Sequence, residues 1–221
     1  MIHQKTFIIA ELSANHGGDI EIAKDTVKAA KRAGADAIKL QTYTADTITL
    51  DAKKDCFKIN QGTHWDGQYL YDLYKDAFLP WEWHSELFKI AEEEGLVCFS
   101  SPFDFSAVDF LEELNTAMYK VASFEITDIP LIRYMASKKK PMIISTGIAG
   151  LKDIELAIDA CKKEGNTDIT ILKCTSEYPA KPEDANLLTI PDIKTRFGVQ
   201  VGFSDHTMGI EGPVVAVALG A

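Results

Sequence analysis

The chain has 221 residues, enough for one α/β domain with a large core. Its hydrophobic share of 46% and charged share of 25% are those of an ordinary globular protein, and no apolar run approaches the ~20 residues of a membrane span. The formal net charge of -10 argues against non-specific binding to nucleic acid or to an anionic membrane surface.

The four cysteines, Cys56, Cys98, Cys161 and Cys174, show no CxxC or paired spacing, which disfavours a metal cluster or a disulfide framework. Free thiols are typical of a reducing cytoplasm. The start of the chain, MIHQKTFIIAE, has neither the basic region nor the long apolar region of a secretion signal. We therefore expect a cytoplasmic protein.

The chain begins with a strand and a helix. Residues 7–10 are a continuous apolar run, which predicts a strand buried on both faces. After the polar loop LSANHGG, Asp19 can cap a helix that Gly34 ends, and a second strand is predicted over residues 35–41.

The same unit then recurs along the chain. Helices are predicted over residues 81–94, 106–114, 130–136, 152–163, 184–196 and 211–219, and strands over residues 96–99, 118–122, 141–144, 169–174 and 199–203. A repeat of roughly 25 to 30 residues predicts a parallel sheet with outer helices. Polar residues end every strand, which favours an incomplete TIM-type (β/α)8 barrel of about seven β/α units over an open doubly wound sheet.

One segment interrupts this rhythm. Residues 44–80 separate the second strand from its helix by far more than the ~2 to 6 residues of a usual connection. The segment is rich in aromatic residues, and its LYDLY stretch predicts a helical turn. It suits a private mini-core and a substrate-covering lid equally. We expect one incomplete barrel domain over residues 1–221, with residues 44–80 as an inserted lid-like segment.

Three lysines lie inside apolar, strand-forming runs: Lys39 in DAIKLQTY, Lys120 in MYKVASFE and Lys173 in ITILKCTSEY. A buried ammonium is unfavourable unless a polar or anionic group meets it. A single lysine of this kind is most simply exposed or paired, but three near strand ends favour a site for phosphate or carboxylate. Lys173 has the weakest claim, because it could point outward toward a helix.

The active site of a parallel α/β barrel lies at the carboxyl ends of its strands. The polar residues expected there, besides the lysines, are Glu11, Gln41, Ser100, Ser101, Ser123, Glu125, Ser145, Thr146, Thr175, Ser176, Tyr178, Ser204, Asp205 and His206. Hydroxyls, amines and backbone amides around one mouth suit an anionic ligand.

Histidines are the candidate metal ligands. His206, at the mouth with Glu11, suits a divalent metal such as Mn²⁺ about as well as it suits a structural hydrogen bond. His16 lies in a loop that could reach the site. His64 has a weaker claim, and His84, on a helix, is interpreted as a surface or packing residue.

Seven separated motifs carry a resemblance. AELSANHGG, IKLQTY, FSSPFD, YKVASFE, ISTGIA, LKCTSEYP and VGFSDH, in this order, resemble the sialic acid synthase family of phosphoenolpyruvate-condensing enzymes. The stretch WDGQYLYDLYKDAFLPWEWH is most similar to the pseudaminic acid branch, with the legionaminic and N-acetylneuraminic acid branches as alternatives. An alternative outside catalysis is a barrel fragment that binds an anion without chemistry.

The resemblance implies a reaction and its ligands. Phosphoenolpyruvate condenses with an N-acetylated amino sugar, in the pseudaminic branch 2,4-diacetamido-2,4,6-trideoxy-altrose, and phosphate is released. The resemblance assigns the phosphate and carboxylate of phosphoenolpyruvate to Lys39, Ser101, Lys120, Ser123 and Ser145.

The resemblance also implies the other roles. His206 would be one of two histidines that bind a divalent metal, Mn²⁺ first, with Mg²⁺ or Co²⁺ as alternatives. Glu11 would assist proton transfer, and Glu125 would contact the sugar or act as acid or base. Gln41 and Tyr178 would help to place the substrates.

Two features depart from the family pattern. Ser176 stands where sialic acid synthases proper carry asparagine, so a hydroxyl would make that phosphate contact. The eighth strand with the second metal histidine, and the antifreeze-like domain of the family's homodimer, do not follow Ala221. We therefore expect a fragment of a larger homodimeric enzyme, with little activity of its own.

Overall fold

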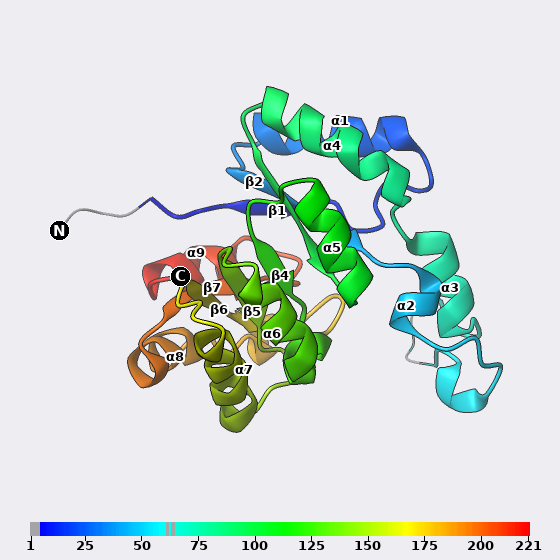
Figure 1. Ribbon diagram of the computed structural model, residues 1–221. Helices are drawn as coiled ribbons and strands as arrows, with labels where there is room; N and C mark the ends of the chain where they lie inside the picture. The colour runs from blue at the N-terminus through cyan, green and yellow to red at the C-terminus, as the bar shows by residue number, and fades with distance from the viewer. Residues whose placement is uncertain (1–4, 61, 63–64) are drawn as a thin grey trace. The chain divides into compact units, whose positions relative to one another are not determined.

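The computed structural model of the protein describes residues 5–60, 62 and 65–221, so His64 lies outside the described residues. The chain forms two compact units (Figure 1). The N-terminal unit is Phe7–Thr116, and the C-terminal unit is Ala117–Ala221 with residues 5–6.

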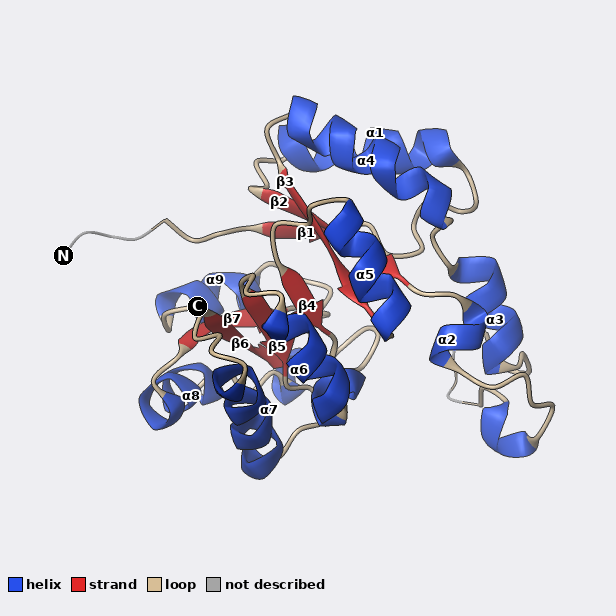
Figure 2. Ribbon diagram, viewed as in Figure 1, coloured by secondary structure: helices blue, strands red, loops and turns tan. Residues whose placement is uncertain are grey.

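Three parallel strands form the sheet of the N-terminal unit, paired in chain order: β1 (Ile9–Glu11), β2 (Ala37–Thr42) and β3 (Val97–Pro102). Its helices are α1 (Ile20–Arg32), α2 (Ala45–Ile48), the 3-10 helix η1 (Asp55–Phe57), α3 (Leu70–Ala77), α4 (Trp81–Glu93) and α5 (Phe105–Glu113). Figure 2 shows the long helices α1 and α4 lying together beside the strands, while α2 and α3 belong to the segment between β2 and α4.

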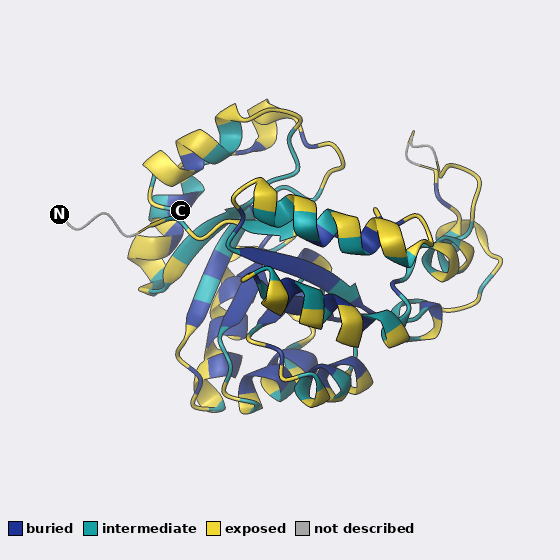
Figure 3. Ribbon diagram, turned by 90° about the horizontal axis from the view of Figure 1, so that it is seen from above, coloured by how far each residue is buried: buried dark blue, intermediate teal, exposed yellow. Residues whose placement is uncertain are grey.

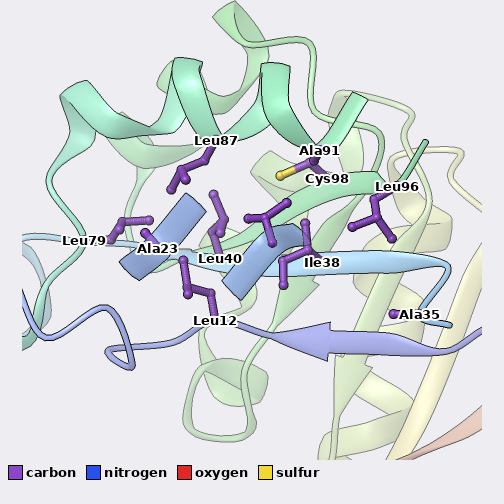
Figure 4. Packing of buried hydrophobic residues seen from close by; sticks show 11 residues of the cluster. Leu12, Ala23, Ala35, Ile38, Leu40, Leu79, Leu87, Ala91, Leu96 and Cys98 are labelled. Carbon is purple, nitrogen blue, oxygen red and sulfur yellow. The ribbon is translucent and has the colours of Figure 1, made fainter. Parts of the chain in front are cut away.

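Alternation along β2 sorts its side chains between the two faces of the sheet. Ile38 and Leu40 join a fully buried cluster with Ala23 of α1 and Leu87 of α4 (Figure 4). Because neighbouring residues of a strand point to opposite faces, Lys39 and Gln41 lie on the face away from α1 and α4. The apolar contact with the helices thus fixes the direction of the polar side chains.

Four parallel strands form the sheet of the C-terminal unit, again paired in chain order: β4 (Tyr119–Val121), β5 (Met142–Ser145), β6 (Ile169–Cys174) and β7 (Gln200–Ser204). Its helices are η2 (Ser123–Thr127), α6 (Ile129–Ser137), α7 (Leu151–Lys163), η3 (Pro182–Asp184), α8 (Thr189–Phe197) and α9 (Glu211–Ala218). Every residue of β4 and β5 is buried, whereas the helices expose one side to solvent (Figure 3).

The expected fold class, α/β with seven successive β/α units of a (β/α)8 barrel, is confirmed for the described residues. The side chain of Asp19 caps α1 as expected, by accepting a hydrogen bond from the backbone of Glu21. The LYDLY stretch begins helix α3. No described helix is both long and apolar enough to cross a bilayer.

One predicted strand was wrong in part, and one segment predicted to be mostly helical is confirmed with an interruption. Residues 7–10 are not a strand buried on both faces: the strand begins only at Ile9, and the side chains of Phe7 and Ile8, which precede it, are each 48% exposed. Residues 184–196 are not one helix, because η3 ends at Asp184 and α8 begins only at Thr189. The positive φ of Asn186 separates the two, a conformation that no α-helix continues through.

Candidate functional site

Four predicted site residues share one face of the N-terminal sheet. Glu11 of β1 is the register partner of Lys39 on β2, and Gln41 is the register partner of Ser101 on β3. Register partners of parallel strands project to the same face, and residues two apart on one strand do so as well. The fold therefore brings Glu11, Lys39, Gln41 and Ser101 together opposite the helices.

An ion pair occupies part of this face. The Nζ of Lys39 lies 2.5 Å from Oε1 of Glu11, and the lysine is only 9% exposed. Nearby, Ser13 donates a hydrogen bond of 3.2 Å to the side-chain oxygen of Gln41. The Oγ of Ser101 is buried and has no hydrogen-bond partner in the described chain. A buried hydroxyl without a partner in the chain keeps a free hydrogen-bonding capacity, which water or a ligand can satisfy.

Lys120 is the buried cation of the C-terminal unit. It is 5% exposed, and its Nζ donates to the carbonyl of Val121 and to Oγ of Ser145, each at 2.6 Å. Glu125, on η2, has one buried carboxylate oxygen without a hydrogen-bond partner in the described chain. Burial raises the pKa of Glu125, and the charge of Lys120 works against that rise.

Gly147, just after β5, brings two predicted serines together. Its backbone N–H donates to Oγ of Ser123 at 3.1 Å. A Cβ added to Gly147 would lie 1.9 Å from Oγ of Ser176 and 2.7 Å from Oγ of Ser123, so both hydroxyls face the bare Cα. Since Ser145 stands two residues earlier, Lys120 and the three predicted serines all converge on the end of β5.

Tyr178 and His206 meet in the loops after β6 and β7. Their ring centroids are 4.3 Å apart. The chain holds them there, because the backbone N–H of Ala180 donates to the carbonyl of His206 at 2.9 Å. The Nδ1 of His206 lies 2.9 Å from the carbonyl of Thr175, which can only accept, so Nδ1 carries the proton.

Cys174 is a site neighbour that sequence reasoning missed. Its buried thiol lies 3.7 Å from Oγ of Ser176 and 3.9 Å from Nδ1 of His206, between the serine cluster and the histidine. Burial by itself would raise its pKa, but hydrogen bonds with His206, Ser123 and Ser176 outweigh burial and lower the pKa of Cys174 to about 6. The only available signal was its position as the last residue of β6.

Lys173 does not join the other lysines as a ligand group. Its half-buried Nζ donates to the carbonyl of Cys174 at 2.8 Å and to Oγ1 of Thr175 at 3.3 Å. These acceptors belong to its own strand end. Lys173 therefore holds the backbone that carries Cys174 and Thr175, as its weaker claim in the sequence suggested.

The described residues do not by themselves fit a metal site. Among residues 5–60, 62 and 65–221, no group of three or more His, Cys, Asp or Glu side chains is arranged to hold a metal ion. In the C-terminal unit His206 brings one imidazole, and in the N-terminal unit the buried ring of His16 packs edge-on against Trp83. Metal binding stays a prediction.

His84 is a packing residue and not a surface residue, so the second of its two interpretations is confirmed. It is fully buried on α4, and its Nε2 lies 2.9 Å from Oγ1 of Thr42 at the end of β2. The hydrogen bond between His84 and Thr42 could not be predicted, because Thr42 lies far from His84 in the sequence.

Comparison with known proteins places the chain among synthases of sialic-acid-like sugars. Residues 26–221 match the NeuB family. The pseudaminic acid synthase of Campylobacter jejuni is 51% identical over 218 residues, which cover 99% of this chain and 63% of that protein. The pseudaminic acid synthase of Helicobacter pylori is 51% identical over 97% of this chain and 63% of its own length. The N,N'-diacetyllegionaminic acid synthase of Legionella pneumophila is 41% identical over 97% of this chain and 61% of its own length.

Solved structures agree with these relatives. The N-acetylneuraminic acid synthetase of Leptospira borgpetersenii superposes with a TM-score of 0.87 at 32% identity, over 99% of this chain and 71% of that one. The spore coat polysaccharide biosynthesis protein SpsE of Bacillus subtilis gives a TM-score of 0.84 at 34% identity, over 99% of this chain and 58% of that one. The chain thus spans less than two thirds of the pseudaminic acid synthases that it matches.

Proposed function

Because this chain belongs to the NeuB family, we propose that it forms part of a synthase that condenses phosphoenolpyruvate with 2,4-diacetamido-2,4,6-trideoxy-altrose to give pseudaminic acid and phosphate. The greater similarity to pseudaminic acid synthases than to the legionaminic acid synthase supports this choice of sugar. In this proposal the full-length protein acts as a cytoplasmic homodimer.

The proposed reaction forms a C–C bond and a C–O bond, and it breaks the C–O bond that joins C2 to phosphate. C3 of phosphoenolpyruvate attacks the aldehyde carbon of the open-chain sugar, and the aldehyde oxygen takes up a proton. Water then attacks C2, and phosphate leaves by cleavage of the C–O bond at C2. The protein must therefore hold a strongly anionic donor and provide groups that move protons.

The observation that carries the proposal is the set of hydrogen-bond donors around the end of β5. Lys120 donates to Ser145, and the hydroxyls of Ser123 and Ser176 converge on Gly147. A buried ammonium beside several hydroxyls suits a phosphate or carboxylate, because bonds to charged groups are short and strong. We assign Lys120, Ser123, Ser145 and Ser176 to phosphoenolpyruvate.

The face of the N-terminal sheet that carries Lys39 is proposed to contact an anionic substrate. Lys39 would bind the anion in exchange for Glu11, whose carboxylate is 40% exposed and so can turn away into solvent. The partnerless hydroxyl of Ser101 would donate to the same ligand, and Gln41 would contact a substrate. Glu11, once released from Lys39, would accept or deliver a proton.

Two further residues are assigned to the sugar. The raised pKa of Glu125 favours its protonated form, which can donate a hydrogen bond or a proton to the aldehyde oxygen. Tyr178, held against His206 and 64% exposed, can pack on a sugar ring. His206 would contribute one ligand to a divalent metal, Mn²⁺ in the first instance.

A panel of sugars tests the proposal. The full-length protein is given phosphoenolpyruvate and one of three acceptors, the altrose derivative, the corresponding precursor of legionaminic acid or N-acetylmannosamine, and phosphate release is followed. We expect the altrose derivative to give the highest kcat/KM. A preference for either other sugar would reassign the protein to the legionaminic or N-acetylneuraminic acid branch.

An anion-binding protein without chemistry is the second candidate. The lack of a metal-ligand group within the described residues favours it. Calorimetry separates the two candidates, because a binding protein takes up phosphoenolpyruvate but releases no phosphate with any sugar of the panel.

A further inference from the structure

A chain of buried hydrogen bonds links helix α4 to the ends of β2 and β3. The Nε2 of His84 lies 2.9 Å from Oγ1 of Thr42, which lies 2.7 Å from Oγ of Ser100. On the other side of the ring, Nδ1 of His84 lies 3.3 Å from the carbonyl of Pro80. Thr42, His84 and Ser100 are all fully buried, so water does not compete for these bonds.

The direction of each bond follows from the acceptor at one end. The carbonyl of Pro80 can only accept, so Nδ1 of His84 carries the proton of the neutral ring. Nε2 then accepts from the hydroxyl of Thr42, and that oxygen accepts from the hydroxyl of Ser100. Burial lowers the pKa of His84 to about 4, which keeps the ring neutral as this pattern requires.

A second bond joins the same two places in the chain. The indole Nε1 of Trp81 donates to the carbonyl of Tyr43 at 3.2 Å. The ring of Tyr43, 4% exposed, packs edge-on against Tyr74 of α3 and Phe103. Thr42 and Tyr43 immediately precede residues 44–80, and Trp81 and His84 immediately follow them. We call Thr42, Tyr43, Trp81, His84 and Ser100 the base clasp.

The base clasp lies directly behind two proposed ligand residues. Gln41 precedes Thr42, Ser101 follows Ser100, and Gln41 and Ser101 are register partners on the opposite face of the sheet. Gln41 and Thr42 are consecutive residues of β2, so their side chains point to opposite faces of one backbone. A displacement of the backbone at Thr42 therefore also displaces Gln41. A polar network in the core can serve packing specificity alone. Here its members are the sequence neighbours of both proposed ligand residues.

We propose that Thr42, Ser100 and His84 are positioning residues, which close the base of residues 44–80 and hold Gln41 and Ser101 where a substrate meets them. The proposal rests on the function proposed above for Gln41 and Ser101. None of the three residues touches the substrate.

Paired variants of one side chain test the proposal in the full-length protein. Thr42→Val keeps the shape but removes the hydroxyl, and Thr42→Ser restores the hydroxyl. Thr116→Val is the matched control, since it removes another buried hydroxyl of the N-terminal unit. The measurements are KM and kcat for each substrate, the urea midpoint, and amide hydrogen exchange over residues 45–59 and 70–77.

We expect Thr42→Val to raise the KM of a substrate about tenfold and to change kcat by less than about threefold, because the variant displaces ground-state contacts. Thr42→Ser should return KM to within about threefold of the parent, and Thr116→Val should leave it unchanged. Amides of residues 45–59 and 70–77 should exchange faster in Thr42→Val than in Thr42→Ser. The reason is that Thr42→Val breaks the hydrogen bonds that join the two ends of this segment.

Three results would overturn the proposal: an unchanged KM in Thr42→Val, a KM raised equally by Thr116→Val, or equal hydrogen exchange in the two Thr42 variants. If the parent protein releases no phosphate with any sugar, the proposed function fails. In that case the comparison of hydrogen exchange in the two Thr42 variants still tests whether Thr42 closes the base of residues 44–80.

Discussion

The ammonium of Lys39 lies 2.5 Å from the carboxylate of Glu11, its register partner on the neighbouring strand. The sequence alone suggested a cation that waits for an anionic ligand. The pair shows that a carboxylate of the protein already meets this cation, so an incoming anion must compete with Glu11. Under the proposed function, Glu11 would oppose anion binding and would then serve as a base beside the bound anion.

Removal of this carboxylate should strengthen anion binding. Glu11→Gln removes a negative charge beside Lys39. Because the Glu11 carboxylate is partly exposed to solvent, we expect the binding free energy of phosphoenolpyruvate to improve by about 1 kcal/mol, or about fivefold in Kd. Phosphate release should fall in the same variant, because Glu11 is proposed to move a proton. Calorimetry checks the affinity, and Glu21→Gln, on the exposed surface of α1, is the control. Weaker binding in Glu11→Gln would remove Lys39 from the anion site.

Loss of Lys120 should weaken the binding of phosphoenolpyruvate. Lys120→Met removes a buried, charge-assisted contact, which we expect to be on the order of 1.5 to 3 kcal/mol, or roughly 10- to 100-fold in Kd. The control is Lys162→Met, which removes an exposed lysine from α7. The comparison requires that both variants show the same urea midpoint within error. Equal affinity in the two variants would refute the assignment of Lys120.

Gly147 should tolerate no side chain while Ser176 keeps its hydroxyl. A methyl group at Gly147 would overlap Oγ of Ser176 at 1.9 Å, so Gly147→Ala should displace the serines and weaken phosphoenolpyruvate binding by about 1 to 3 kcal/mol. The second variant, Gly147→Ala with Ser176→Gly, relieves the overlap and should recover part of the loss. A double-mutant cycle on the affinities measures this coupling. Strict additivity would show that the two residues do not meet.

His84 should make folding sensitive to mild acid. Its pKa is about 4 in the folded protein against an ordinary value of 6.5, so the unfolded chain binds more protons between these values. The contribution of His84 to the free energy of unfolding should be fully present above pH 6.5. The free energy of unfolding should then fall by about 3 kcal/mol as the pH decreases to 4. In urea titrations, His84→Gln should flatten this part of the profile. An unchanged slope would mean that another group titrates.

Local signals in the sequence predicted most elements because those elements depend on near neighbours. Asp19 caps α1 through a residue two positions away, and β6 spans Ile169–Cys174 as its apolar run predicted. The rule that polar residues at the carboxyl ends of parallel strands form the site also selected Gln41 and Ser101, which the structure shows to be register partners.

The errors concern partners that are distant in the sequence. The pairing of Lys39 with Glu11 depends on the register of β1 and β2. The hydrogen bond of His84 joins it to Thr42, which lies on the other side of the inserted segment in the sequence. Cys174 gave no signal, because its neighbours Ser176 and His206 come from different loops. Phe7 was misjudged since an apolar run does not reveal where pairing of the strand begins. The roles of the site residues in catalysis remain predictions.

The hydrogen bonds that join the two ends of residues 44–80 have a consequence for how far the segment can vary. Within the segment, Lys58 bridges Tyr69, and Tyr71 of α3 donates to Asp46 of α2 at 3.0 Å, so it carries its own internal contacts. An insertion that starts and finishes at one tied point can change in length and composition without disturbing the strands beneath. We therefore expect substitutions within this segment to leave the parallel strands, and the proposed anion-binding residues on them, in place.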